Sequence, residues 1–376
     1  MNQSNSTQPP RILTVFGTRP EAIKLAPFVL AANASDAVDH RFCVTGQHRQ
    51  MLDQVMAMFG LTPNYDLNIM KAGQTLDDVV CAVLRGAGTV MDEWRPDWVV
   101  VQGDTSTAFA AAMAGFHRKV RVAHVEAGLR TGNLMSPWPE EANRRLIGQV
   151  SSLHFAPTAW AQANLLREGF DPKIVEVTGN TVIDALHWVT AKLDAATASD
   201  PFPFLNAEKR LILVTGHRRE NLDGGLERTC TALAALSARD DVEIVYPVHL
   251  NPLVREVADR VLGHRSNVHL IPPQEYLPFV QLMRRAAIIV TDSGGIQEEA
   301  PGLGKPVLVT RDTTERPEAI EAGTAMLVGT DIQPLVDAVT RLLDDNQAYA
   351  AMAQARNPFG DGQASARMLA RIIMES

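Results

Sequence analysis

Three acidic residues in the first half of the chain stand where predicted elements end or begin, which suits them to proton transfer. Asp104 follows an apolar run in QGDTSTAF, Glu126 ends another in HVEAGLR, and Glu140 opens a helical stretch in SPWPEEANRR. Each also has a structural explanation, although Glu126 is the hardest to explain that way, because Gly128 and Arg130 suggest an exposed loop beyond its strand. Asp104 could cap a helix that begins at Thr105. Glu140 could pair with Arg144, four residues further on. Three acids at the ends of three elements together favour general acid–base catalysis.

A second group of residues is cationic and also follows a predicted strand. In FGTRPEAIKLAP, Arg19 and Lys24 lie near the start of a predicted helix, just after a strand that ends at Gly17. Backbone N–H groups at a helix start bind anions, and turn chemistry alone explains an arginine in a tight turn poorly. We therefore favour an anion site that combines these N–H groups with Arg19 over a plain strand–helix join with solvated charges.

The segment TGHRREN places His217 directly after another predicted strand. Gly216 precedes it and two arginines follow it, a combination that suits a diphosphate. His48 and His249 occupy comparable positions in TGQHR and YPVHLNP. A lone histidine is more often structural than catalytic, so His217 is the one for which we predict a role in the site.

A glycine pair follows a predicted strand in TDSGGIQEEAPGLGKP. The strand covers Ala287–Thr291, the turn contains Ser293–Gly295, and a helix is expected from about Ile296. Paired glycines let a phosphate approach the backbone closely, and the helix start supplies oriented N–H donors. Glu298 and Glu299 then fall in the first helical turn. They either complement the helix dipole or grip the two hydroxyls of a ribose.

Several familiar motifs are missing from the chain. There is no HExxH, HxxxH or Cys/His spacing, so we predict no metal site. There is also no GxGxxG after the first strand and no GxxxxGK[ST]. We therefore expect no cofactor, and in particular neither a nicotinamide cofactor nor P-loop ATP chemistry.

These residues need a scaffold that collects strand ends, and the sequence periodicity predicts one. Short runs rich in Val, Ile and Leu alternate with helical stretches, which is typical of parallel sheets covered by helices. The expected strands are Arg11–Gly17, Arg41–Gly46, Trp98–Gly103, Val120–Val125, Leu153–Ala156, Ile174–Thr178, Leu211–Thr215, Val242–Pro247, Val268–Ile271, Ala287–Thr291, Pro306–Thr310 and Ala325–Val328. The fold class is thus α/β, with two doubly wound, Rossmann-like domains facing across a cleft at the carboxyl ends of their sheets.

The domains are expected at residues 11–180, with the catalytic acids, and 181–362, with nucleotide binding. Residues 1–10 read as a disordered leader, and the helical stretch at 363–376 is expected to fold back onto the first domain. The best linker candidate is Ala191–Arg210, which mixes small polar residues with prolines, although the boundary could fall near Gly179.

Composition excludes several classes of function. The 376 residues carry a formal charge of -8, so there is no general basic field to attract nucleic acid or an anionic membrane. The three cysteines have no metal-like spacing and, being odd in number, cannot all pair within one chain. No secretory signal or membrane-spanning apolar run is present. We expect a soluble, cytoplasmic protein.

The motifs resemble those of the non-hydrolysing UDP-N-acetylglucosamine 2-epimerases, a family with the two-domain GT-B architecture. The resemblance runs from about Arg11 to Arg367. It rests on FGTRPEAIKLAP, GQHRQMLDQV, HVEAGLRTG, SPWPEEANRR, TGNTVIDAL, TGHRREN, YPVHLNP, TDSGGIQEEAPGLGKPVLV and RDTTERPEA. It implies an isomerase that acts as a homodimer, with UDP-N-acetylglucosamine, UDP-N-acetylmannosamine and UDP as its ligands and an active site between the two domains.

The resemblance also assigns roles to residues. The positions that match the UDP-binding residues of the family are Arg19, His217, Ser293, Gly294, Gly295 and Glu299. Those that match its catalytic acids are Asp104, Glu126 and Glu140, with Lys24, Arg144 and His217 as supporting charges. A second, regulatory UDP-N-acetylglucosamine site is matched by Gln47, His48, Gln74 and His249. Gly73 stands where some regulated members carry an arginine, so this chain departs from their pattern.

The residue inventory suits such a reaction on chemical grounds. The C2 hydrogen of a closed pyranose is not acidic, so direct exchange would be far too slow. Elimination of UDP from C1 to a 2-acetamidoglucal, followed by re-addition, needs carboxylates near C2 and a cationic clamp on the departing diphosphate.

Three rival functions remain. A GT-B glycosyltransferase would need an acceptor substrate, and a hydrolysing epimerase of the bifunctional type would carry an added kinase domain. A nucleotide-sugar sensor would not need the acids.

Overall fold

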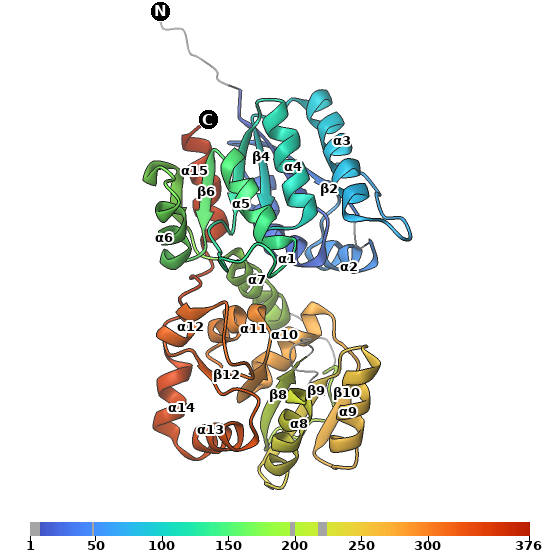
Figure 1. The fold of residues 1–376 in the computed structure, drawn as a ribbon, viewed down its shortest axis with the longest axis vertical. Helices are drawn as coiled ribbons and strands as arrows, with labels where there is room; N and C mark the ends of the chain where they lie inside the picture. The colour runs from blue at the N-terminus through green and yellow to red at the C-terminus, as the bar shows by residue number, and fades with distance from the viewer. Residues whose placement is uncertain (1–7, 47–48, 196–199, 217–223) are drawn as a thin grey trace, which may run out of the picture. The chain divides into compact units, whose positions relative to one another are not determined.

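A computed structural model describes residues 8–46, 49–195, 200–216 and 224–376. The chain folds into two compact units, which are visible in Figure 1. Unit 1 comprises Met1–His187 and Phe359–Ser376, and unit 2 comprises Trp188–Pro358. Three residues for which we predict a role, Gln47, His48 and His217, lie outside the described residues. No helix in the described part of the chain is both long and apolar enough to cross a membrane.

Unit 1 is built on a seven-stranded parallel sheet in the order β3-β2-β1-β4-β5-β6-β7. The strands are β1 (Arg11–Phe16), β2 (Asp39–Val44), β3 (Tyr65–Asp66), β4 (Trp98–Gln102), β5 (Arg121–Val125), β6 (Leu153–Ala156) and β7 (Val175–Val177). All of β4 is buried, because helices cover both faces of the sheet. The strand order reverses between β1 and β4. Doubly wound sheets bind their ligands outside the carboxyl ends of the strands at such a reversal.

The helices of unit 1 form two rows. They are α1 (Arg19–Asn33), α2 (Arg49–Phe59), α3 (Leu76–Trp94), α4 (Ser106–His117), α5 (Glu140–Val150), α6 (Ala159–Arg167), α7 (Thr181–Ala195) and α15 (Ala364–Met374), with a short 3₁₀ helix at Pro172–Ile174. Helices α3, α4 and α5 pack in sequence against one another, and α1 packs between α2 and α15. The right-handed crossovers β1-α1-β2 and β4-α4-β5 run in opposite directions along the sheet, so they put α1 and α4 on opposite faces.

The C-terminal helix belongs to unit 1, beside the N-terminal helix α1 (Figure 1). Asp184 of α7 accepts hydrogen bonds from the backbone N–H groups of Ala364 and Ser365, at 3.2 and 2.7 Å, and so caps α15. At its other end, the indole of Trp98 donates to the Ser376 hydroxyl at 3.1 Å. The end of the chain is therefore tied to the sheet that carries Asp104.

Unit 2 repeats the design with a six-stranded parallel sheet in the order β10-β9-β8-β11-β12-β13. Its strands are β8 (Arg210–Thr215), β9 (Val242–Pro247), β10 (Val268–Ile271), β11 (Ile288–Thr291), β12 (Val307–Val309) and β13 (Ala325–Leu327). Its helices are α8 (Gly225–Leu236), α9 (Pro252–Leu262), α10 (Tyr276–Arg285), α11 (Gly294–Glu299), α12 (Pro317–Glu321), α13 (Ile332–Asp344) and α14 (Asn346–Ala353), with a 3₁₀ helix at Ala300–Leu303. The strand order reverses between β8 and β11.

The predicted α/β class with two doubly wound domains is confirmed. Three local features differ from the prediction. The two-residue strand β3 was not predicted, because so short a strand leaves no apolar run. The proposed linker from Ala191 begins inside α7, and the units divide within this continuous helix, between His187 and Trp188. Helix α11 starts at Gly294 rather than Ile296.

Candidate functional site

Asp104 and Glu126 lie at the same edge of the unit 1 sheet. Each follows one of two neighbouring parallel strands, β4 and β5, whose final residues Gln102 and Val125 are paired in register. The turn at Gly103 has a φ of +70°, and a Cβ placed on it would lie 3.6 Å from Oε2 of Glu126. That distance is an ordinary contact, so it is the positive φ of the turn, rather than lack of space, that favours glycine here.

The Glu126 carboxylate is buried, and three side chains within the described ranges donate hydrogen bonds to it. Lys24 of α1 and Asn180, just before α7, donate to Oε1, the latter at 3.0 Å, while Gln102 donates to Oε2. Glu126 itself has a φ of +62°, which is strained for a non-glycine residue. Such strain persists only where the surroundings enforce it, and it concentrates at functional sites.

Asp104 is held by α5. Arg144 contacts one oxygen of its carboxylate through Nη2 at 2.5 Å and through Nε at 3.0 Å, and the Asn143 amide donates to its backbone carbonyl at 2.9 Å. Burial raises the pKa of Asp104, Arg144 opposes that shift, and the neighbouring charge of Glu126 adds to it. Thr105, not Asp104, caps α4 through a bond to the Ala108 N–H. The capping explanation of Asp104 is therefore wrong.

Arg144 pairs with Glu141 and not with Glu140, which differs from our expectation. Glu141, fully buried, contacts Arg144 at 3.2 Å and Arg145 at 3.0 Å, so the pair expected between Glu140 and Arg144 is not formed. Glu141 also accepts the backbone N–H of Thr131 at 3.1 Å. Glu140 is half-buried in the first turn of α5, one turn before Arg144, and one of its carboxylate oxygens is buried without a partner among the described residues. That oxygen is available to a ligand.

A buried histidine supports the turn behind Asp104. Nε2 of His124, on β5, lies 2.7 Å from the carbonyl oxygen of Gly103. Burial lowers the pKa of His124 to about 4, so the ring is neutral near pH 7. Because a carbonyl can only accept, Nε2 carries the proton, and His124 fixes the backbone of the turn without adding charge.

The start of α1 differs from the predicted anion site. The N–H groups of Gly17 and Thr18 donate to the buried carboxylate of Glu21, at 3.0 and 2.8 Å, within a capping box. These N–H groups are therefore occupied, which corrects the expectation that they join Arg19 in binding an anion. Arg19 is partly exposed at the first position of α1 and has no ion-pair partner in the described ranges. Lys24, further along the same helix, forms an ion pair with Glu126.

In unit 2 the Ser293–Gly295 turn lies at the reversal of strand order. The hydroxyls of Thr215 and Thr291, the last residues of β8 and β11, lie 2.6 Å apart, which joins the two strand ends. Ser293 is the N-cap of α11, and its side chain caps no backbone N–H group. The turn thus presents a glycine-rich helix start at the position where such sheets bind ligands.

The acids after this turn are structural partners of other segments. Since α11 begins at Gly294, Glu298 and Glu299 fall in its last turn, so their expected place in the first turn is wrong. Glu298 pairs with Arg316, and Tyr276 of α10 donates to Oε2 of Glu299 at 2.6 Å. A Cβ placed on Gly294 would lie 3.8 Å from the Arg316 guanidinium. The turn is therefore flanked by a cation that the sequence reasoning did not select.

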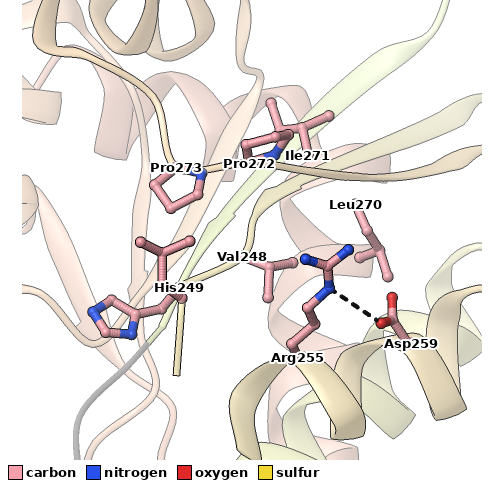
Figure 2. A pocket seen from close by; sticks show the side chains of 9 residues that line it. Val248, His249, Arg255, Asp259, Leu270, Ile271, Pro272 and Pro273 are labelled. Carbon is pink, nitrogen blue, oxygen red and sulfur yellow. Dashed lines mark ion pairs between the residues drawn. The ribbon is translucent and has the colours of Figure 1, made fainter. Parts of the chain in front are cut away.

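A pocket opens at the carboxyl ends of β9 and β10 in unit 2 (Figure 2). Its lining includes Val248, His249, Leu270, Pro272 and Pro273, together with the Arg255–Asp259 ion pair at 3.5 Å. Figure 2 shows the imidazole of His249 directed away from that ion pair. Its Nδ1 accepts the backbone N–H of Asn251 at 3.1 Å, which leaves the proton of the neutral ring on Nε2. The pocket can hold a ligand with an apolar portion and a polar edge.

Gln74 lies in unit 1, in the loop before α3. Its side chain closes that loop by accepting from the Lys71 N–H and donating to the Ile69 carbonyl, both at 2.8 Å. The neighbouring Gly73 is exposed, with a φ of +72°, and a Cβ there would meet nothing within 4 Å. Space does not exclude an arginine at this position, but the positive φ would strain any side chain there.

The structure adds residues that the sequence reasoning missed. Gln102, Asn180 and Glu141 hold the predicted acids or their partners, while Tyr276 and Arg316 hold the acids of α11. Asn180 and Arg316 lie in motifs that were noticed, TGNTVIDAL and RDTTERPEA, but no local signal linked them to a carboxylate. Among the described residues, no three His, Cys, Asp or Glu side chains form a group suited to a metal ion.

Two doubly wound parallel sheets, with an acid–cation cluster on one and a glycine-rich turn on the other, define an α/β enzyme of the GT-B-like class. A solved structure from Neisseria meningitidis, described as a UDP-GlcNAc 2-epimerase bound to UDP-GlcNAc, is similar to this chain with a TM-score of 0.89 and 48% identity. The alignment covers 97% of this chain and 100% of that one. A UDP-GlcNAc 2-epimerase from Methanocaldococcus jannaschii, in complex with UDP-GlcNAc and UDP, has a TM-score of 0.78 and 34% identity, and the alignment covers 97% and 100%.

Sequence comparison agrees with the fold. The model of the UDP-N-acetylglucosamine 2-epimerase family matches residues 30–373. The UDP-N-acetylglucosamine 2-epimerase of Yersinia pestis is 56% identical over 365 residues, which cover 96% of this chain and 97% of the relative. The chain belongs to the UDP-N-acetylglucosamine 2-epimerase family and is an isomerase.

Proposed function

We propose that this protein interconverts UDP-N-acetylglucosamine and UDP-N-acetylmannosamine without a cofactor, by eliminating UDP and adding it back. The observation that carries the proposal is the cluster in which Asp104 pairs with Arg144 and Glu126 with Lys24 at adjacent strand ends. The relatives that bind UDP-GlcNAc and UDP support the choice of substrate. The product would serve as a precursor of bacterial surface polysaccharide.

In the first step a carboxylate takes the C2 proton while the C1–O bond to UDP breaks. The electrons of the C–H bond form the C1=C2 double bond of 2-acetamidoglucal, and UDP leaves with the electrons of the C1–O bond. In the second step a carboxyl group on the other face returns a proton to C2, and a UDP oxygen forms the new bond to C1. We assign proton transfer to Asp104 and Glu126, with Glu140 as their partner or alternative.

The leaving diphosphate needs cations and N–H donors, because negative charge develops on it as the C1–O bond breaks. We assign diphosphate binding to Arg19, Lys24, Arg144, His217 and the turn residues Ser293, Gly294 and Gly295, and we assign the ribose of UDP to Glu299. The position of the Ser293–Gly295 turn at the β8/β11 reversal supports the assignment. Oε1 of Glu299 lies 3.8 Å from where a Cβ on Gly295 would stand, so the carboxylate faces the glycine-rich turn, which supports placing it near the ribose hydroxyls.

Regulation is a separate part of the proposal. We assign Gln47, His48, Gln74 and His249 to a second UDP-N-acetylglucosamine that activates the enzyme, and the pocket beside His249 supports this (Figure 2). Initial rates against substrate concentration should be sigmoidal, and His249→Ala should make them hyperbolic. Hyperbolic kinetics of the unaltered protein would contradict activation, and Gly73→Arg would then test whether the missing cation is the reason.

The assembly and location are likewise inferred from the resemblance. We propose a cytoplasmic homodimer that interacts with neither nucleic acid nor membrane. Light scattering coupled to gel filtration should give twice the mass of the chain. A mass equal to one chain at micromolar concentration would contradict the dimer.

Incubation with UDP-N-acetylglucosamine in deuterated water, followed by NMR, separates this function from its rivals. Epimerisation gives two UDP-sugars in equilibrium, with deuterium at C2. Hydrolysis gives free sugar, a transferase without acceptor leaves the substrate intact, and a sensor does the same.

Glu126→Gln and Asp104→Asn should abolish deuterium incorporation while UDP still binds with nearly unchanged affinity. Asp92→Asn is the matched control, because Asp92 is an exposed carboxylate whose ion-pair partner in the described part of the chain is Arg118. Equal losses of rate and of UDP affinity in the two acid variants would mean that these acids are structural rather than catalytic.

A further inference from the structure

Asn180 is the residue from which the chain enters α7, and its side chain is fixed at both ends. Its Oδ1 accepts the backbone N–H of Val182 at 3.1 Å, so its amide nitrogen must face the other way. That nitrogen donates to Oε1 of Glu126 at 3.0 Å. Asn180 is only 2% exposed, so solvent cannot readily replace this bond.

The backbone of Asn180 is held as firmly as its side chain. Its N–H donates to the carbonyl of Phe359 at 2.7 Å, at the point where the chain returns to unit 1. Gly179 and Gly360 make this approach feasible, since a Cβ on either glycine would lie 3.2 Å from the Cα of the other. The first residue of the returning segment thus fixes the position of Asn180.

Glu126 needs such support because of its own backbone. Its φ of +62° lies outside the range of a β-strand, so the strand backbone does not set the direction of its side chain. Gln102 holds Oε2 from β4, while Asn180 and Lys24 hold Oε1. The two amides add hydrogen-bond donors without adding charge, and such donors stabilise the ionised form of a carboxylate.

We propose that Asn180 is a positioning residue that, together with Gln102, aims the ionised Glu126 carboxylate at the C2 proton of the substrate. The inference rests on the proposed function, since it takes Glu126 as a group that transfers the C2 proton. Asn180 acts through Glu126 and does not exchange a proton itself.

Asn180→Asp is the sharpest test, because it keeps the shape and the acceptor for Val182 but replaces the donor with a negative charge. In the pH profile of kcat, the apparent pKa of the acid limb should rise by a unit or more, since a neighbouring anion disfavours ionised Glu126. At neutral pH, kcat should fall roughly ten- to hundredfold from misplacement of the base. UDP affinity should stay within about twofold of the unaltered enzyme.

Asn164 provides a matched control. It is also a buried asparagine, and its amide donates at 2.9 Å to the carbonyl of Gly128, two residues after Glu126, without touching the carboxylate. Asn164→Asp should lower the melting temperature but leave the apparent pKa of the acid limb in the pH profile of kcat unchanged. If Asn180→Asp does not fold, Gln102→Leu removes the second neutral donor without altering α7 and should shift the same limb upward.

Glu126→Gln, measured in parallel, tests the role of Glu126 separately from the role of Asn180. If it keeps full activity, the proposed role of Glu126 fails. If it is inactive while Asn180→Asp has an unaltered acid limb and kcat, the positioning role of Asn180 alone is overturned. A shift of the limb of equal size in Asn164→Asp would also overturn it, because the effect would then be general loosening of the loop.

Discussion

Arg144 contacts the Asp104 carboxylate through two of its nitrogens, at 2.5 and 3.0 Å, and through the third it contacts Glu141 at 3.2 Å. A single guanidinium on α5 therefore joins the end of β4 to the helix that begins at Glu140. Glu141 is fully buried and Asp104 is partly buried, so burial raises the pKa of Asp104 and the charge of Arg144 opposes that shift.

Arg144→Met should change the pH dependence of the reaction. Arg144 lowers the pKa of Asp104 against the effect of burial, so its loss raises that pKa. If ionised Asp104 is needed, the acid limb of kcat/KM moves to higher pH, and activity at neutral pH falls. The free energy of unfolding should also drop by about 3 kcal/mol, because the buried carboxylate of Glu141 and the partly buried one of Asp104 both lose a partner.

Arg145→Met controls for the general effect of losing a cation from α5. Arg145 contacts Glu141 at 3.0 Å but is not bonded to Asp104 in the described structure. Its side chain is 39% exposed, so its loss should cost less than about 1 kcal/mol. A shift of the acid limb in this variant equal to that in Arg144→Met would disprove a specific role for Arg144.

Glu21 should make the protein less stable as pH rises. Burial raises the pKa of Glu21 above its ordinary value of 4.5, although its hydrogen bonds oppose the shift. The folded chain thus holds this proton more tightly than the unfolded chain, so the contribution of Glu21 to the free energy of unfolding is fully present below pH 4.5 and is lost as pH rises through its raised pKa. Glu21→Gln should remove this contribution, as measured by melting temperature against pH.

Glu21→Ala tests the capping role by itself. It removes the acceptor of the Gly17 and Thr18 N–H groups and of the Thr105 hydroxyl, at 3.0, 2.8 and 2.6 Å. Because the two backbone donors are buried and the Thr105 hydroxyl is partly buried, unfolding should become easier by roughly 2–3 kcal/mol. An Ala variant as stable as the Gln variant would refute the role of these bonds.

Tyr276→Phe should weaken nucleotide binding rather than chemistry. The Tyr276 hydroxyl donates to Glu299 at 2.6 Å, and without it the carboxylate loses its fixed orientation. We expect UDP affinity, measured by calorimetry, to fall by roughly 3- to 10-fold, the worth of one hydrogen bond. kcat at saturation should change little. A fall in kcat with unaltered UDP affinity would contradict the assignment of Glu299 to the nucleotide.

Asp184→Ala should release the C-terminal helix. Asp184 accepts the N–H groups of Ala364 and Ser365 in a buried setting, and their loss should cost about 1–3 kcal/mol. Hydrogen exchange should accelerate in α15 before it does in the central strands. Asp171→Ala, which removes an exposed cap from the 3₁₀ helix Pro172–Ile174, should cost less and leave α15 protected.

Local patterns predicted much of this fold. Short runs of mainly apolar residues located β6, β9 and β10 to the residue, although each strand carries one polar side chain and β10, at the edge of its sheet, is only partly buried. Placing Asp104, Glu126 and the Ser293–Gly295 turn after such runs was enough to select them, since the carboxyl ends of parallel strands converge. The sequence by itself therefore determined the sheets and the segments that carry the site.

Only the tertiary structure decided which charges meet. Whether Arg144 turns to Glu140 or Glu141 depends on how α5 is rotated against β4, and helical spacing allows both. Asn180 reaches Glu126 across 54 residues, and Arg316 reaches Glu298 across 18, through packing of separate elements. Such contacts are set by strand register and helix orientation, which no local pattern of residues encodes.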